Sequence, residues 1–463
     1  MPSTISVPFL KLNHPLRIPL SAEVHSRPSL KIQSPASITH FAIYAKSGSI
    51  STDDNLEAQH RLLSSFCSVY GVASPHIEAK YFLYDFGRFR LQWECHTEFA
   101  TYSFVENDEV SLSERNQDDC DVASLFQYMP LRHLPKQWLD ELKEKIIVAA
   151  HIALVKSNTM PGLIKTWQPA FEGLVLVGSK VLDRGEVWSD FLIQSDGFTR
   201  YIVNDENFIQ QQAGRTVQRV LEIETYRMMA LLGLPDAQSA NPALVEIESE
   251  LVKLTSALAL VGTSQYANSE RYQVTNDNDI EQKLLRQIID LAVRLEKLTV
   301  GNSYRFSASK AYFDIVKARI NELREFRIEG IPTISEFMER RLAPAMNTCE
   351  AIVRRQEALA RRIAHTNDLL RTRVGIVQEL QNRQILQSMD ARAGQQLKLQ
   401  QSVEGLSVVA ISYYLVGLLQ YAGKGLKASG VAVNVELISG LLIPVVAAGV
   451  WFGLRKLHKT IVN

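Results

Sequence analysis

The sequence predicts a mixed α+β protein with an N-terminal α/β domain, a helical bundle that continues into a long stalk helix, and a C-terminal two-helix transmembrane hairpin. Three observations support this class. Short runs rich in aromatic and β-branched residues fill 37–204, helical periodicity replaces them after Asn204, and charge-free apolar stretches lie at 405–423 and 437–454. A chain of 463 residues has room for about three structural units.

The N-terminal segment, 1–36, is expected to be extended because it is rich in proline. It has no basic start followed by an unbroken apolar run, so it does not have the pattern of a secretory signal. His25 and Arg27 lie here beside Glu23 and form a candidate anion-binding or catalytic cluster. A structural role, in which they fix a loop through hydrogen bonds, is the interpretation we favour.

The segment 37–204 is predicted to be the α/β domain, and we expect it to be cytoplasmic. An apolar face with helical spacing predicts a helix over 55–70, and a second helix is expected near 135–145. Gly87 and the triplet 195–197 are expected turns. The predicted strands are 38–45, 79–86, 88–95, 98–105, 146–155, 174–181, 186–194 and 198–203.

Glu94, His96 and Glu98 alternate along the sequence. In one extended strand all three side chains point to the same face, which is a geometry that binds metals. No further ligand is identifiable from the sequence, so a polar sheet face is the favoured interpretation. Together with His25 and Arg27, these residues form a candidate polar cluster if the fold brings them together.

The segment 205–343 is predicted to be a helical bundle with breaks at glycines and prolines, among them Gly301. Glu224 and Arg227 are three residues apart and Glu222 and Tyr226 are four apart, so each pair is expected to meet on one helix face. The predicted helices are 206–233, 242–261, 278–300, 307–327 and 334–342.

The segment 344–404 is predicted to be a stalk helix, because no proline interrupts 345–423. Its apolar seam is thin and is followed by many glutamines, and a lone helix with so little to bury is unstable in water. We therefore expect a coiled-coil type of association, and a homo-oligomer.

The segments 405–423 and 437–454 are each long enough to cross a hydrocarbon core of about 30 Å at a rise of about 1.5 Å per residue. Buried core helices are the alternative, but two apolar segments in tandem favour a membrane hairpin. Basic residues before the first span and in the tail 455–463 favour cytoplasmic termini, which makes the loop 424–436 periplasmic.

Two features within the spans suggest contacts. Ser407, Tyr414 and Tyr421 recur at intervals of seven residues, so one stripe of the first span is polar and faces either a pore or a neighbouring helix. Gly449 and Gly453 form a small-xxx-small pair in the second span, which permits close helix packing.

Composition and motifs exclude several classes of function. Lys plus Arg and Asp plus Glu both total 50, and the stalk lacks stacking aromatics, so nucleic acid is not an expected partner. The four cysteines are scattered without a Cys-x-x-Cys pair, which indicates a reducing compartment and no zinc or dithiol motif. No phosphate-binding loop and no nucleophile with a base is identifiable. We therefore expect no cofactor, no metal and no catalytic residues.

Five segments of the chain are familiar as a set: His25-Ser26-Arg27-Pro28, 93–99, 196–200, 222–227 and 403–414. Together they resemble a bacterial family of uncharacterised membrane-anchored proteins. The resemblance implies a cytoplasmic domain held on the inner membrane of a Gram-negative bacterium and supplies no activity. The architecture is also similar to that of the CorA-type magnesium transporters. Those transporters carry a Gly-Met-Asn motif after the first span, and it is missing here, because this chain reads Gln420-Tyr421-Ala422-Gly423-Lys424-Gly425 at the end of its first span.

The sequence thus predicts a multi-pass protein of the bacterial inner membrane whose termini are cytoplasmic. We expect it to be a homo-oligomeric, non-enzymatic scaffold that contacts the lipid bilayer and an unknown cytoplasmic partner. The alternative is a CorA-like ion transporter or channel, in which the stripe of Ser407, Tyr414 and Tyr421 lines the pore.

Overall fold

The computed structural model describes residues 13–18, 20–21, 31–44, 52–107, 122–156, 164–209, 211–267, 274–428 and 435–461. The chain divides into two compact units. The first unit contains Met1–Lys253 and Asp290–Ala364, and the second contains Leu254–Ile289 and His365–Asn463. The mixed α+β class predicted from the sequence is confirmed.

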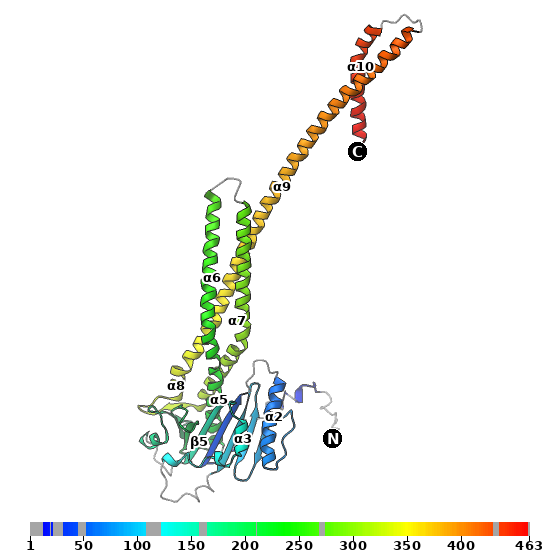
Figure 1. Cartoon of the computed structure of the whole chain (residues 1–463). Helices are drawn as coiled ribbons and strands as arrows, with labels where there is room; N and C mark the ends of the chain where they lie inside the picture. Colours follow the sequence, from blue (N-terminus) through cyan, green and yellow to red (C-terminus); the bar gives the residue numbers. More distant parts are fainter. Residues whose placement is uncertain are drawn as a thin grey trace, which may run out of the picture. The chain divides into compact units, whose positions relative to one another are not determined.

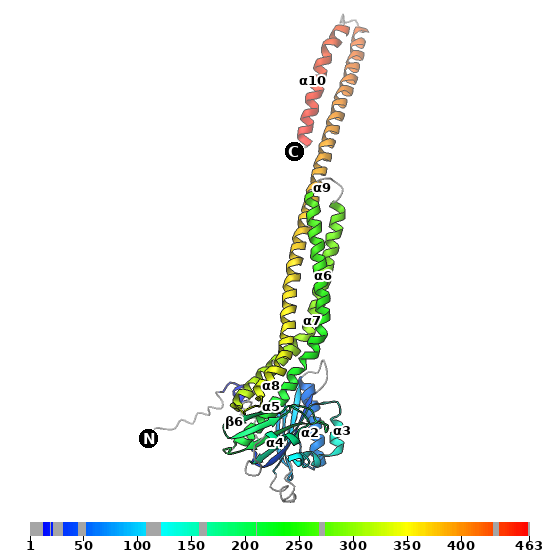
Figure 2. The ribbon, with the colours of Figure 1, turned by 90° about the vertical axis from the view of Figure 1, so that its left-hand side faces the viewer.

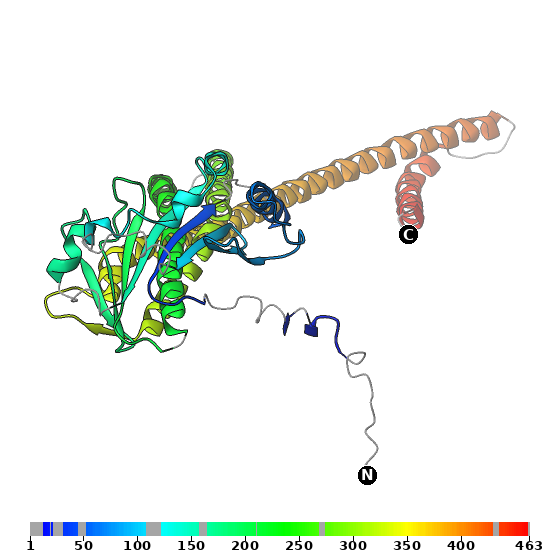
Figure 3. The same ribbon diagram turned by 90° about the horizontal axis from the view of Figure 1, so that it is seen from below.

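A nine-stranded sheet forms the centre of the first unit within the described residues, in the order β2-β3-β4-β1-β5-β8-β7-β6-β9. The interior strand β1 runs antiparallel to both of its neighbours, β4 and β5, whereas the central strand β5 pairs with β8 in parallel. Figure 3 shows the twist of this sheet. The strands are β1 (Ala36–Tyr44), β2 (Tyr81–Asp85), β3 (Arg90–Cys95), β4 (Phe99–Asn107), β5 (Ile146–Lys156), β6 (Val177–Val181), β7 (Gly185–Ser189), β8 (Thr199–Asp205) and β9 (Glu325–Arg327).

The helices of the described chain fall into short and long groups (Figure 1). The shorter ones are α2 (Thr52–Val69), α3 (Lys136–Glu141), α4 (Ile164–Trp167), α5 (Gln212–Leu231) and α8 (Ile334–Arg341). The longer ones are α6 (Gly233–Ala267), α7 (Val274–Leu323), α9 (Ala343–Ala428) and α10 (Val435–Ile461). The helices α6, α7 and α9 contribute residues to both units.

One face of the sheet is an apolar layer covered by α2 and α3, which lie beside each other in Figures 1 and 2. Alternate residues of β3 and β4 point into it, and its largest side chains, Trp93, Tyr102, Phe104 and Trp138, are almost fully buried. Trp138 Nε1 donates to the backbone oxygen of Leu62 in α2 at 3.0 Å, which ties the two helices together. This layer is the main core beneath β1, β3 and β4.

The opposite face of the sheet packs against α5. The contact includes a hydrogen bond between His40 of β1 and Thr225 of α5, and another between Tyr201 of β8 and Glu224 of α5. Buried Val217, Val220 and Leu221 also belong to this helix. The sheet therefore has an apolar face and a face on which polar side chains meet a helix.

In the second unit, the apolar part of α9 is exposed. Among the described residues, α9 belongs to the one helical stretch long and apolar enough to cross a membrane, and none of its apolar window is buried. The helix α10 carries a shorter apolar segment, Gly440–Gly453. The long helix predicted from the sequence is confirmed, and the two-span hairpin stays a prediction.

The structure corrects three predictions about the helical part of the chain. The gap predicted between the helices 206–233 and 242–261 lies within α6, which runs from Gly233 to Ala267 with Pro242 inside it. Gly301 does not break a helix, because α7 runs without interruption from Val274 to Leu323. An interior glycine costs a helix only about 1 kcal/mol relative to alanine, which neighbouring turns absorb. The region after Asn204 is not wholly helical either, because Arg324 adopts a φ of 48° where α7 ends and the edge strand β9 follows. A strand of three residues is too short to show a period-two pattern.

Candidate functional site

Strand alternation creates the polar face of the sheet. In β3, Leu91, Trp93 and Cys95 enter the apolar layer, so Gln92 and Glu94 point to the other face. In β4 the same alternation turns Thr101 and Ser103 toward that other face, because Tyr102 and Phe104 enter the apolar layer. Antiparallel pairing sets Gln92 opposite Ser103 and Glu94 opposite Thr101, so the four polar side chains form one patch.

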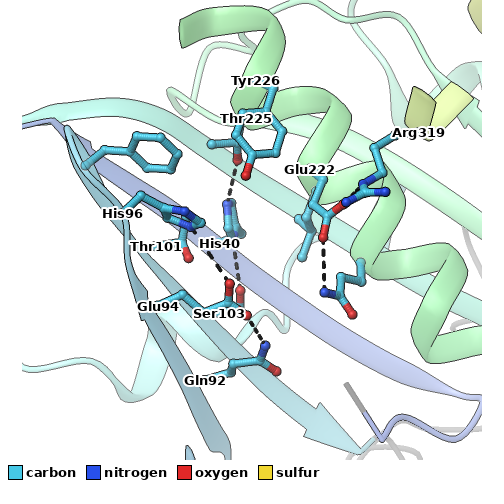
Figure 4. Close-up of a pocket in the computed structure, with 13 residues that line it drawn as sticks. His40, Gln92, Glu94, His96, Thr101, Ser103, Glu222, Thr225, Tyr226 and Arg319 are labelled. Atoms are coloured by element: carbon cyan, nitrogen blue, oxygen red, sulfur yellow. Dashed lines mark hydrogen bonds and ion pairs between the residues drawn. The ribbon is translucent and has the colours of Figure 1, made fainter. Parts of the chain in front are cut away.

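A cavity of about 220 Å³ lies between this patch and the helices α5 and α7, entirely within the first unit. We call it the polar cavity; Figure 4 shows its lining. The lining residues are His40, Gln92, Glu94, His96, Phe99, Thr101, Ser103, Gln218, Leu221, Glu222, Thr225, Tyr226 and Arg319.

His40 of β1 links the two walls of the polar cavity. Its Nδ1 lies 2.8 Å from Ser103 Oγ on β4, and its Nε2 lies 3.0 Å from Thr225 Oγ1 on α5. Burial lowers the pKa of His40 to about 3, so the ring is neutral at physiological pH. The three side chains therefore form an uncharged chain of hydroxyl, imidazole and hydroxyl groups (Figure 4).

Glu94 and His96 form the end of the cavity near the β3–β4 turn. His96 Nε2 lies 3.8 Å from Glu94 Oε2, and Gln92 Nε2 donates to Glu94 Oε1 at 2.6 Å. The ring of His96 stacks on Phe99, with 4.5 Å between ring centroids, and Phe99 meets Tyr226 at 6.1 Å. A carboxylate therefore sits beside an aromatic wall.

Glu222 carries a second carboxylate into the cavity from α5. It forms an ion pair with Arg319 of α7, and Gln218 Nε2 donates to its Oε1 at 3.1 Å. Burial raises the pKa of Glu222, and the nearby Arg319 guanidinium opposes this rise. Arg319 also donates to Glu322 Oε1 at 2.5 Å, so one guanidinium serves two carboxylates.

Glu98 does not share a face with Glu94 and His96, which corrects the prediction of one extended strand. β3 ends at Cys95 and β4 begins at Phe99, so His96 lies in the turn that reverses the chain. Glu98 instead accepts hydrogen bonds from Arg305 at 2.5 Å and from Tyr312 at 2.7 Å, both on α7. Burial and Glu98 together raise the pKa of Tyr312.

A buried charged cluster next to the cavity joins α5 to β8. Arg227 donates to both oxygens of Glu224, at 2.5 and 2.8 Å, and Tyr201 donates to the same carboxylate. Burial alone lowers the pKa of Arg227, but Glu224 and Tyr201 outweigh it and raise the pKa. The predicted pairing of Glu224 with Arg227 is confirmed, whereas Glu222 and Tyr226 both line the cavity.

The other predicted site residues are not among the described residues that line the cavity. His25 and Arg27 lie outside the described residues. On α9, Ser407 Oγ donates to the backbone oxygen of Val403 at 2.8 Å, and Tyr414 and Tyr421 are exposed. On α10, the positions where Gly449 and Gly453 would carry a Cβ have no described atom within 4 Å.

The groups that line the cavity include hydroxyls, amides, carboxylates and aromatic rings. The described part of the chain contains no group of three His, Cys, Asp or Glu side chains placed to hold a metal. Ser103 and His40 have the spacing of a nucleophile and its base, but a ring whose pKa is about 3 is a weak base at neutral pH. The third group is the hydroxyl of Thr225 rather than a carboxylate.

Sequence reasoning missed His40, Ser103, Thr225 and Arg319 as site residues. Each is a single polar residue in a different element, and His40 and Thr225 are 185 positions apart. One sequence signal was available for His40. Successive side chains of β1 point to opposite faces of the sheet, so His40 points away from the face that its apolar neighbour Phe41 occupies.

Comparison with known proteins gives a family and no activity. No curated protein and no solved structure matches the chain. One family matches residues 12–461, which is nearly the whole chain. The chain therefore belongs to the family described as "Protein of unknown function (DUF3422)".

Proposed function

We propose that this protein is anchored in a bacterial inner membrane by the apolar part of α9 and by α10. In this proposal both termini are cytoplasmic, and copies of the chain associate into a homo-oligomer. The protein acts as a non-enzymatic scaffold whose α/β sheet presents a binding surface to a cytoplasmic partner. Four observations support the proposal. They are the exposed apolar surface of α9 and α10, the basic residues that flank it, the small residues of α10, and the exposed apolar side chains of α9 ahead of the proposed span.

The exposed apolar surface of α9 and α10 is the observation that carries this proposal. Leu406, Leu418 and Leu419 of α9 are exposed by 76%, 68% and 41%. At about 100° per residue these three side chains point in well-separated directions around the helix, so apolar side chains lie on all of its sides. Such a helix is stable only where lipid or protein replaces water around it. Leu441, Val445 and Phe452 extend the same argument to α10.

The charges that flank the apolar segments support the proposed orientation. Arg392 and Lys398 precede the first segment, and Arg455, Lys456 and Lys459 follow the second. Cytoplasmic flanks carry an excess of Lys and Arg. Both ends of the proposed hairpin therefore belong on the cytoplasmic side.

Association between copies is supported by two features of the second unit. Leu386, Met389 and Leu397 of α9 are exposed ahead of the proposed span, which leaves apolar surface for a partner helix. Gly449 and Gly453 leave open space along α10, where another helix can approach closely.

The experiment that tests the anchor is fractionation of bacterial cells that express the full chain. The native protein is expected to stay with the membranes after washing with high salt and with alkaline carbonate, and to dissolve in detergent. Replacing Ile411 and Leu415 together by arginine is expected to move protein out of the membrane fraction, since each arginine at a span centre costs about 2.5–3.5 kcal/mol.

The matched control places the same two charges outside the span, as Gln396→Arg with Gln400→Arg. This control is expected to remain in the membrane fraction. Release of the native protein by carbonate contradicts the anchor. Native mass spectrometry of the detergent extract tests the association separately: a monomer contradicts it, and a ring of about five copies favours the CorA-like alternative.

A further inference from the structure

The polar cavity is lined by carboxylates and hydrogen-bond acceptors, which suit a cation that carries several N–H donors. We propose that it binds a small primary amine, of the amino alcohol class, whose ammonium group lies between Glu94 and the side-chain oxygen of Gln92. The inference concerns the first unit and is independent of the membrane anchor. Nothing in the family description assigns a ligand.

Gln92 provides the observation that points to a ligand. Its side chain is 5% exposed, and its Oε1 is buried without a hydrogen-bond partner in the described chain. The amide orientation follows from chemistry, because the carboxylate of Glu94 accepts only and must face the Nε2 of Gln92. The unpartnered atom is therefore an acceptor that needs a donor.

The carboxylates make the cavity a site for a cation. Glu94 and Glu222 line opposite walls, one on β3 and one on α5 (Figure 4). Of the described lining residues, Arg319 is the one guanidinium, and it pairs with Glu222 through Nε and with Glu322 through Nη1. His40 adds no charge, because burial lowers its pKa. An anionic ligand would meet two carboxylates here.

The aromatic wall and the hydroxyl groups restrict the ligand further. Phe99 and Tyr226 line the same cavity as Glu94, and aromatic rings attract ammonium groups. Thr101, Ser103 and Thr225 supply hydroxyls that donate or accept hydrogen bonds. In a ligand with neighbouring ammonium and hydroxyl groups, the ammonium group contacts the carboxylate and the aromatic rings, and the hydroxyl group bonds to the hydroxyls of the cavity.

The size of the cavity suits a small ligand. Its volume of about 220 Å³ is below the roughly 300 Å³ at which typical sites for drug-sized ligands start. A compound of a few carbon atoms therefore fits inside it.

The experiment is isothermal titration calorimetry on the full chain in detergent, in a phosphate buffer that contains no amine. Ethanolamine is the probe. Choline carries the same charge but no N–H donor, ethylene glycol carries the hydroxyls without the charge, and glycolate carries the opposite charge. Ethanolamine is expected to bind at least about tenfold more tightly than each of the other three.

Variants locate the binding. Glu94→Gln is expected to weaken ethanolamine binding at least about tenfold, and Gln92→Leu is expected to weaken it because the acceptor is removed. Glu78→Gln is the matched control, since it removes one carboxylate at an exposed position ahead of β2, outside the cavity. Its affinity is expected to equal that of the native protein.

Four outcomes overturn the inference. These are choline binding as tightly as ethanolamine, glycolate binding more tightly, no detectable heat from ethanolamine at millimolar concentration, and full affinity in a folded Glu94→Gln variant. If Glu94→Gln does not fold, the ranking of the four compounds on the native protein decides. None of these outcomes bears on carbonate resistance, so a failure here is distinguishable from a failure of the membrane anchor.

Discussion

The two faces of the strands β3 and β4 differ in how their side chains pack, although successive residues of the same strands supply both faces. On the face toward α2 and α3, Trp93, Tyr102 and Phe104 are buried in continuous aromatic contact. On the face toward α5, Gln92 and Ser103 are also buried, but they line a cavity and leave an acceptor without a partner. Burial alone therefore does not distinguish a packed face from a binding face.

The difference shows how this sheet separates stability from binding. Because side chains alternate with a period of two, a shift of register by one residue would exchange the two faces. The aromatic layer fixes the register of β3 against β4, and that register places Glu94 opposite Thr101 at the cavity. The apolar face thus positions the polar one. The following predictions test this division, from the largest expected effect to the smallest.

Trp93→Ala is expected to lower the free energy of unfolding by about 3–5 kcal/mol, because it empties a fully buried aromatic position. Urea denaturation followed by circular dichroism measures the change. Trp451→Ala in α10, at a side chain exposed by 46%, is the matched control and is expected to leave the transition of the sheet unchanged. A loss below about 1 kcal/mol for Trp93→Ala would show that the aromatic layer does not carry the stability.

Arg227→Met is expected to lower the free energy of unfolding by about 3 kcal/mol, because it leaves the carboxylate of Glu224 buried beside Tyr201 without its cation. The matched control on the same helix is Arg219→Met. Its pair with Glu322 is more exposed, so a loss below about 1 kcal/mol is expected there. Equal losses in the two variants contradict the role given to burial.

Stability is expected to fall as the pH is lowered from about 6.5 toward 3, and both faces contribute. His40 faces the cavity, whereas His151 stacks on Phe198 in the apolar layer, and burial lowers the pKa of each to about 3. Between these values the unfolded chain binds protons that the folded chain does not, so stability is lost as the pH falls.

The slope tests this pH dependence. Each histidine is expected to contribute about 1.4 kcal/mol per pH unit below pH 6. His40→Gln and His151→Gln are each expected to reduce the change in unfolding free energy between pH 6 and pH 5 by about that amount. A native slope that survives in both variants would show that neither ring is held neutral.

Gln92→Leu is expected to lower the free energy of unfolding by about 1 kcal/mol, because the hydrogen bond from Nε2 to Glu94 is lost while a buried acceptor without a partner is removed. Its neighbour Trp93 supplies the contrast, since it points to the opposite face of the same strand. Urea denaturation under the same conditions provides the measurement. A loss as large as that of Trp93→Ala would mean that the polar face also carries stability.

The sequence predicts much of the fold and little of the site. Runs rich in aromatic and β-branched residues identify β1 to β8, helical periodicity identifies α2 and α5, and the absence of proline identifies the long helix α9, because these signals are local. The break predicted at Gly301 is wrong because a glycine weakens a helix without ending it. β9 was missed because three residues show no periodicity.

The candidate site was predicted only where its residues are close in sequence. Glu94 and His96 were identified from their spacing, and they line the cavity. Glu98 was wrongly placed with them because the position of the turn after Cys95 was misjudged. Arg319 reaches the cavity from a helix far along the chain, and no local pattern predicts such a contact.

The two hydrogen bonds that join Ser103, His40 and Thr225 run in the same direction from donor to acceptor. A neutral imidazole has one donor and one acceptor nitrogen, so either Ser103 donates and Thr225 accepts, or the reverse holds. Exchanging the tautomer reverses every hydrogen bond in the row while no heavy atom moves. The wall of the cavity can therefore present a hydrogen-bond donor to one occupant and an acceptor to another without any movement of its heavy atoms.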